Sequence, residues 1–167
     1  MLNAQQILQE GLLKLEHSKG KPAQIGYDLS LKQVRKIGSG IGKVLKDKTE
    51  LNVYTVQDTV STDGGVVGWL LTQGVYDITF YEGCKIPADR VGLIRQRSSL
   101  LRNGTVLHSS VFDPGFETNY MGTVMVVNET IFIEEGARVA QIYFHQCEPV
   151  QELYNGQWQH DVQRTKQ

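Results

Sequence analysis

Short stretches in which apolar and polar residues alternate dominate the chain from residue 25 onward. The alternation is clearest in residues 51–60, 75–81 and 122–127, and Gly, Asp or Asn separates many of the runs. A period of two places successive side chains on opposite faces of a β-strand. Many short strands with regular turn residues between them are typical of a sandwich or barrel. The pattern therefore predicts an all-β fold, and the length of 167 residues fits one domain over residues 1–167.

The first segment, residues 1–20, has a helical pattern instead. Asn3 is a suitable N-cap, and a helix is expected over residues 4–16, ending before Gly20. Four apolar residues fall on one side of this helix: Ile7, Leu8, Leu12 and Leu15. The sequence thus predicts a short N-terminal helix before the strands.

Charge and composition narrow the classes of function. The chain has 17 basic and 18 acidic residues and a net charge of −1, which argues against a dedicated nucleic-acid binder. It contains no run of about eighteen apolar residues, so we expect no transmembrane helix. The N-terminus lacks the basic start of a signal peptide, so Cys84 and Cys147 are expected to be reduced thiols. The expected location is the cytoplasm, or the host cytoplasm if the protein is viral.

The candidate chemistry is concentrated in residues 97–116. This stretch opens with four side chains that suit an anion: Arg97, Ser98, Ser99 and Arg102. Forked guanidinium N–H donors match phosphate oxygens, so the cluster predicts a polyphosphate ligand. The stretch closes on Asp113 in an Asp-Pro-Gly turn, where a carboxylate suits a base that orients water.

Three other segments add to this stretch. Asp28 lies in an early strand, Gln141 is a polar residue in an apolar strand, and Tyr154 and Trp158 are aromatic residues in a polar C-terminal segment. Each of these features alone is more often structural than functional, and the same holds for His108, which is a lone histidine in its segment. Together, and in this order, they form a pattern.

That pattern resembles the dCTP deaminase and trimeric dUTPase superfamily. The resemblance covers most of the chain, through six segments in the family's order: residues 26–29, 86–93, 97–102, 111–116, 135–141 and 154–159. It implies a distorted, jelly-roll-like β-barrel that assembles as a homotrimer. It also implies active sites between subunits and a C-terminal segment that closes over a pyrimidine deoxynucleoside triphosphate.

The resemblance also implies roles for individual residues. The phosphate-binding positions fall on Arg97, Ser98, Ser99, Arg102 and Gln141, with Asp28 supporting the phosphate and metal region. The positions that bind the pyrimidine and sugar fall on Leu107, His108, Ser109, Ser110, Val111 and Phe116. The lid, within residues 150–167, falls on Tyr154, Gln157, Trp158 and Gln159, and its polar end, residues 158–167, is expected to be mobile without ligand.

Two activities occur in this superfamily, and the residues favour one of them. Deamination needs a glutamate in the strand after the turn, but residues 122–128 contain no acid, and Val111 stands where deaminases carry an arginine. Hydrolysis of dUTP to dUMP and pyrophosphate needs a water-orienting carboxylate, which Asp113 supplies, and Mg²⁺ on the phosphates.

The alternatives stay open at this point. A shifted alignment could recruit Glu117 or Glu129 for a dCTP deaminase, with or without dUMP formation. The C-terminal segment also resembles the deaminase type of lid, with Gln157 where that lid carries a lysine. A superfamily member that binds a nucleotide without turning it over is the third alternative.

Overall fold

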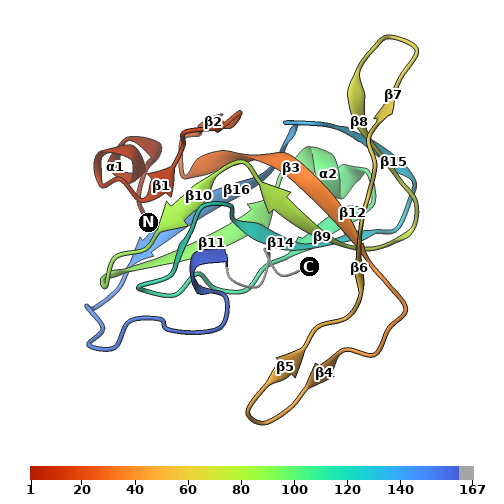
Figure 1. The fold of residues 1–167 in the computed structure, drawn as a ribbon. Helices are drawn as coiled ribbons and strands as arrows, with labels where there is room; N and C mark the ends of the chain where they lie inside the picture. The colour runs from red at the N-terminus through yellow and green to blue at the C-terminus, as the bar shows by residue number, and fades with distance from the viewer. Residues whose placement is uncertain (162–167) are drawn as a thin grey trace.

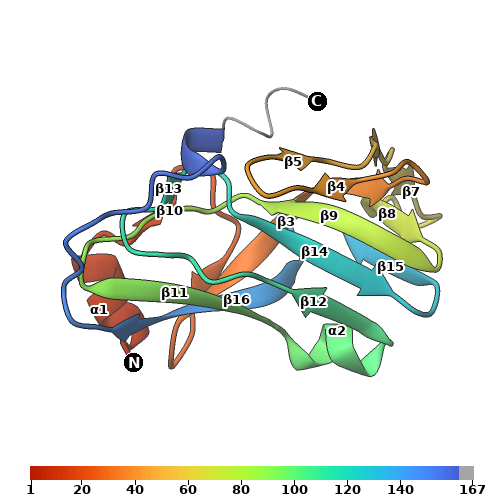
Figure 2. The ribbon, with the colours of Figure 1, turned by 90° about the horizontal axis from the view of Figure 1, so that it is seen from below.

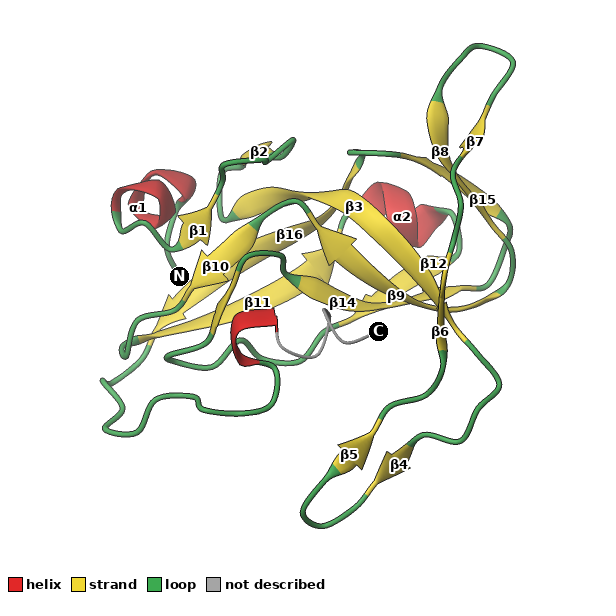
Figure 3. Ribbon diagram, viewed as in Figure 1, coloured by secondary structure: helices red, strands yellow, loops and turns green. Residues whose placement is uncertain are grey.

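A computed structural model describes residues 1–161, and these residues form a mainly β structure (Figures 1 and 3). The helices are α1 (Ala4–Gln9), α2 (Ser98–Arg102) and the 3₁₀ turn η1 (Gln159–Asp161). The strands before residue 82 are β1 (Leu13–Lys14), β2 (Lys21–Pro22), β3 (Tyr27–Ile37), β4 (Lys43–Val44), β5 (Thr49–Glu50), β6 (Tyr54–Val56), β7 (Val60–Ser61), β8 (Val67–Leu71) and β9 (Gly74–Phe80). The later strands are β10 (Gly83–Lys85), β11 (Arg90–Gln96), β12 (Thr105–His108), β13 (Glu117–Thr118), β14 (Gly122–Val127), β15 (Ile131–Glu134) and β16 (Arg138–Gln146).

The main sheet is antiparallel and runs in the order β11-β16-β3-β9-β14-β12. Its two edges approach each other, because the backbones of Gly92 in β11 and Phe112 after β12 exchange two hydrogen bonds of 2.9 Å. The sheet is therefore nearly closed into a barrel. The prediction of an all-β, barrel-like fold is confirmed.

The apolar alternation of the strands fills the interior of this barrel. In β14, Thr123, Met125 and Val127 are buried, while the residues between them are half-buried. The buried apolar residues form one core cluster, which also includes Ile7 and Leu12 from the N-terminal segment. Cys84 and Cys147 are free thiols, and no helix in the described part of the chain is long and apolar enough to cross a membrane.

The predicted N-terminal helix is wrong beyond Gln9. Asn3 does cap α1, since its side chain accepts a hydrogen bond from the Gln6 amide at 2.9 Å. The helix stops because Gly11 adopts a positive φ of 63°, and the chain then enters β1, which pairs with β10. Within α1, Ile7 is buried, but Leu8, which the helical pattern placed on the same side, is 42% exposed.

The predicted strand over residues 51–60 is also interrupted. Only β6 and the start of β7 form there, and two hairpins, β4–β5 and β7–β8, project from the barrel (Figure 1). The C-terminal segment instead returns to the body, where η1 lies beside β10 and β13 (Figure 2). The expectation of a mobile tail concerns in part residues 162–167, which lie outside the described residues.

Candidate functional site

The Asp113–Gly115 turn follows directly from the closure of the barrel. Phe112 is held against Gly92, and the amide of Gly115 then donates to the carbonyl of Ile86 at 2.8 Å. Gly115 has a φ of 90°, a conformation that favours glycine. These backbone bonds fix the turn and leave the side chain of Asp113 exposed to solvent.

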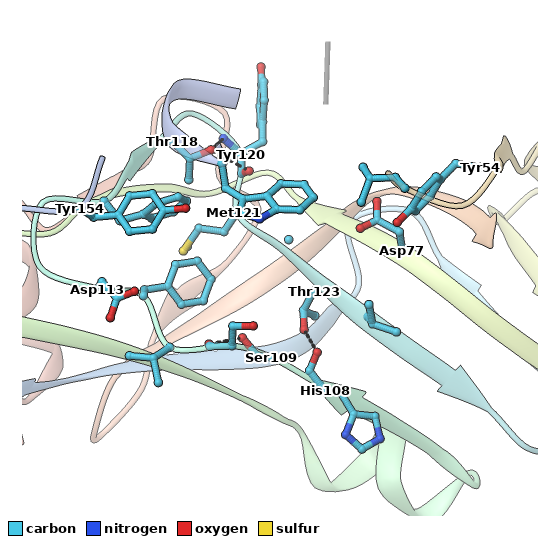
Figure 4. Close-up of a pocket in the computed structure, with 18 residues that line it drawn as sticks. Tyr54, Asp77, His108, Ser109, Asp113, Thr118, Tyr120, Met121, Thr123 and Tyr154 are labelled. Carbon is cyan, nitrogen blue, oxygen red and sulfur yellow. Dashed lines mark hydrogen bonds between the residues drawn. The ribbon is translucent and has the colours of Figure 1, made fainter. Parts of the chain in front are cut away.

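A cavity of about 480 Å³ opens beside this turn, and we call it the turn cavity (Figure 4). Ser109, Ser110 and Val111 line one wall, and Gly122, Thr123 and Val124 line the facing wall. The β12–β14 ladder ends at the His108–Val124 pair, so residues 109–111 lie beyond it. Their backbone groups are therefore placed to bind a ligand rather than a neighbouring strand.

The C-terminal segment covers the turn cavity at the Asp113 end. The Tyr154 amide donates to the Pro114 carbonyl at 2.8 Å, and the Tyr154 ring meets Phe116 edge to face at 5.4 Å. Gln159 bonds on both sides: its Oε1 accepts from the Glu117 amide at 2.9 Å and its Nε2 donates to the Gly115 carbonyl at 2.8 Å. Tyr154 and Trp158 thereby become part of the cavity lining.

An ion pair lies at the opposite end of the turn cavity. Arg35 in β3 stands directly across from Asp77 in β9, and both its Nε and Nη2 donate to Asp77 Oδ2, at 3.0 and 2.6 Å. The Tyr54 ring covers the guanidinium at 5.0 Å. Figure 4 shows Asp77 and Tyr54 on one side of the cavity and Asp113 on the other, with Thr123 between them.

A second cavity, of about 650 Å³, lies beside Arg97, and we call it the arginine cavity. Arg97, Ser98 and Gln141 line it together with Lys21 and Gln24 from the loop around β2. Gln141 pairs in register with Asp28 on one side and Arg95 on the other, so β16 brings the polar residues of three strands together. The donors of this cavity suit an anion.

The buried carboxylate of Asp28 holds two arginines at the arginine cavity. Asp28 is 4% exposed, and its Oδ2 accepts from Arg97 and, at 3.2 Å, from Arg138. This burial shows that Asp28 is not a solvent-facing residue of its strand. One carboxylate between two guanidinium groups leaves a net positive site with both arginines held in place.

The structure brings together some of the residues predicted for the site and leaves others apart. The turn cavity includes Asp113 and, from the predicted pyrimidine and sugar set, His108, Ser109, Ser110, Val111 and Phe116. Leu107 is 6% exposed and packs in the core instead, because it points to the inner face of β12. Ser99, Arg102 and Gln157 are exposed and line neither cavity, while Arg97, Ser98, Gln141 and Asp28 line the arginine cavity.

The two cavities share no lining residue. Within one chain, the carboxylate of Asp113 and the cationic group around Arg97 therefore belong to separate pockets.

The cavity residues that sequence reasoning missed include four polar side chains: Lys21, Gln24, Tyr54 and Asp77. Asp77 could have been found from the sequence, since it is the charged residue of β9 and lies between the apolar residues Tyr76 and Ile78. The other three lie in or beside the short strands β2 and β6, whose positions depend on pairing with β3.

The described residues contain no group of three His, Cys, Asp or Glu side chains that could hold a metal. The Asp28 carboxylate already accepts from two arginines, so its surroundings do not suit a metal ligand. Near the turn, the ammonium of Lys14 hydrogen-bonds Glu117 and lowers the pKa of that carboxyl, with an ion-pair distance of 2.7 Å. A divalent ion would thus depend on oxygen atoms of a ligand, as is usual for Mg²⁺ on phosphates.

Comparison with known proteins places the chain in one family. The family model of dCTP deaminase-like proteins matches residues 2–147, and the chain belongs to that family. Among curated relatives, the probable deoxyuridine 5'-triphosphate nucleotidohydrolase of Methanosarcina mazei is 31% identical over 153 residues, which are 88% of this chain and 87% of the relative. The deoxyuridine 5'-triphosphate nucleotidohydrolase of Methanocaldococcus jannaschii is 36% identical over 134 residues, 80% of this chain and 83% of the relative.

Solved structures show the same fold. The dUTPase of EIAV matches with a TM-score of 0.52 at 13% identity, over 89% of this chain and 99% of that chain. The dCTP deaminase of Agrobacterium tumefaciens matches with a TM-score of 0.55 at 20% identity. That match covers 86% of this chain but only 46% of the Agrobacterium chain, so this chain spans about half of its length.

Proposed function

We propose that the protein is a dUTP diphosphatase, which hydrolyses dUTP to dUMP and pyrophosphate. The observation that carries the proposal is the exposed carboxylate of Asp113 at the edge of a cavity that the C-terminal aromatics partly cover. The names of the relatives from Methanosarcina mazei and Methanocaldococcus jannaschii support the same reaction. The buried apolar residues form one cluster, which supports a single domain as the acting unit.

In the proposed reaction the nucleoside occupies the turn cavity. The backbone of residues 109–111 reads the edge of the base, and Phe116 and Tyr154 pack near the sugar. Asp113 orients a water and accepts its proton as the water oxygen bonds to the α-phosphorus. The bond from that phosphorus to the bridging oxygen breaks, and pyrophosphate leaves.

The triphosphate is bound by the arginine cavity of a neighbouring copy. Arg97, Ser98 and Gln141 supply charge-assisted and neutral hydrogen bonds, and Asp28 keeps Arg97 in position. The absence of shared lining residues supports an intersubunit site, and we propose a homotrimer as the assembly. The two free thiols support a cytoplasmic location, which is also part of the proposal.

We propose that Mg²⁺ enters the site on the triphosphate as part of the substrate complex. Such an ion neutralises charge on the phosphates as pyrophosphate departs. The protein's own contribution is to hold the phosphate oxygens through Arg97 and Ser98. Asp28 acts through Arg97 in this proposal.

Deamination of dCTP finds less support at this site. The residues of β14 that line the turn cavity, Gly122, Thr123 and Val124, carry no acid. The other carboxylate of the cavity, Asp77, already accepts two N–H groups of Arg35, which suits binding better than proton transfer.

The substitution Asp113→Asn tests the proposed chemistry. It keeps the size of the side chain but removes the proton acceptor, so kcat for dUTP is expected to fall about 100-fold or more. Binding of the non-hydrolysable analogue α,β-imido-dUTP, measured by calorimetry, is expected to stay within about threefold. Unchanged turnover in this variant would remove Asp113 from its role.

A further inference from the structure

The Arg35–Asp77 pair places a carboxylate at the end of the turn cavity that lies opposite Asp113. Asp113 lies at the end of the turn cavity where the α-phosphate must be, so a bound nucleoside points its base away from Asp113. Leu51, Tyr54 and Asp77 line that opposite end, as Figure 4 shows for the last two. This reasoning rests on the proposed function, because it takes Asp113 as the residue that orients the water.

The carboxylate is held in a fixed position. Arg35 is 7% exposed, and the Asp77 side chain is 14% exposed. Two hydrogen bonds to one oxygen, the cross-strand register and the covering Tyr54 ring all restrain the guanidinium that binds Asp77. A preorganised acceptor of this kind discriminates between ligands better than a flexible one.

A structural role alone does not require this pair. A buried ion pair loses hydration, and apolar residues of similar size often stabilise a protein as well. The neighbouring residues Tyr76 and Ile78 of the same strand are apolar and face the core, whereas Asp77 faces the cavity. Its position therefore suits a ligand more than it suits packing.

We propose that Asp77 is a specificity-determining residue that accepts a hydrogen bond from a donor group on the pyrimidine. Uracil presents carbonyl oxygens beside its single N–H, and a carboxylate repels those oxygens. A base with an added donor, such as the 4-amino group of cytosine or a hydroxymethyl group at C5, matches a carboxylate directly. The substrate class is thus widened to pyrimidine deoxynucleoside triphosphates that carry such a donor.

The test compares kcat/KM for dUTP, dCTP and 5-hydroxymethyl-dUTP in the wild-type protein and in Asp77→Asn. The wild type is expected to hydrolyse at least one of the two donor-bearing nucleotides at no less than the kcat/KM for dUTP. In Asp77→Asn the ratio of that nucleotide to dUTP is expected to fall about tenfold or more, since a charge-assisted bond is lost. A change confined to dCTP identifies the amino group, and one confined to 5-hydroxymethyl-dUTP identifies the C5 substituent.

Asp58→Asn is the matched control. It removes the same charge from an exposed residue outside both cavities, and the ratio is expected to stay at the wild-type value. Thermal melting of Asp77→Asn checks that the variant folds. Binding of the α,β-imido analogues of dUTP and dCTP gives the same comparison without turnover.

Three outcomes would overturn the inference. The wild type could accept neither donor-bearing nucleotide, Asp77→Asn could change every substrate by the same factor, or Asp58→Asn could shift the ratio equally. Failure of the proposed function has a different signature, namely that dUTP itself is bound but not hydrolysed by the wild type.

Discussion

One buried carboxylate, Asp28, positions two guanidinium groups at the arginine cavity. It accepts from Arg97 and Arg138 while being 4% exposed itself. Without its charge, two cations would face each other across a partly dehydrated site. The geometry of the cationic site therefore depends on this buried carboxylate.

Asp28→Asn is expected to weaken both folding and phosphate binding. Loss of hydrogen bonds to a charged group costs about 1.5–3 kcal/mol, which urea unfolding would measure as a lower midpoint at unchanged slope. KM for dUTP is expected to rise more than kcat falls, because Arg97 loses its position. Asp58→Asn, an exposed acid outside both cavities, is the control. Wild-type stability and KM in Asp28→Asn would contradict the assigned role.

Sequence reasoning at the level of single residues reached part of this site. Arg97 and Ser98 were predicted as anion-binding residue types, Asp28 as an acid in an early strand and Gln141 as a polar residue in an apolar strand. The structure places these four residues around one cavity. Burial could not be derived in the same way, since Asp28 pairs with Gln141 of β16, a strand that lies far along the chain from it. Arg102 illustrates the reverse case, because α2 directs it to solvent although its motif suggested a phosphate contact.

At the scale of elements, the C-terminal segment and the Asp113–Gly115 turn form one unit. Gln159 bonds the Gly115 carbonyl and the Glu117 amide, and a Cβ on Gly115 would come within 2.6 Å of Leu153 Cβ. The lid is thus docked on the turn of its own chain by a few specific contacts. Such a small contact set allows opening at modest cost.

Gln159→Ala is expected to loosen this lid. Two hydrogen bonds to the turn are lost, each worth about 1 kcal/mol, together with a longer one of 3.4 Å to the Tyr154 carbonyl. KM for dUTP should therefore rise about three- to thirtyfold, with a smaller change in kcat. Steady-state kinetics measure the effect, and limited proteolysis in residues 148–158 should become faster. Gln151→Ala, exposed and outside both cavities, serves as the control. Equal kcat and KM values in Gln159→Ala and Gln151→Ala would show that the lid contacts of Gln159 do not contribute to substrate binding.

Element boundaries were predicted less well than element types. The strands followed from alternation, which is local, whereas the end of α1 is set by Gly11 and by the pairing of β1 with β10. The β-propensity of residues 51–60 was likewise overridden, because only β6 finds a partner in β3. Long-range pairing decided both cases, and a single sequence does not display it.

At the scale of the whole molecule, the proposed reaction divides the site between two cavities of each chain. The turn cavity has the carboxylate proposed for hydrolysis, and the arginine cavity has the cations, with no lining residue in common. A symmetric oligomer can repeat the missing half at every interface. The proposed homotrimer accounts for this division.

A mixture of two inactive variants tests the division. Arg97→Ala damages one half-site and Asp113→Asn the other, and each alone is expected to lose most activity. After the two are unfolded and refolded together, random assembly should restore about a quarter of the wild-type activity. A mixture that stays as inactive as its components would place both halves in one chain.

The central claim is the identity of the reaction, and a product assay tests it most directly. The wild-type protein is incubated with Mg²⁺ and, in separate reactions, dUTP, dCTP, dTTP and UTP, and ion-exchange chromatography resolves the products. The account predicts that dUTP yields dUMP and pyrophosphate in equal amounts, and that any dCTP consumed yields dCMP. Conversion of dCTP to dUTP or dUMP would establish deamination instead, and no turnover of dUTP would contradict the proposed hydrolase.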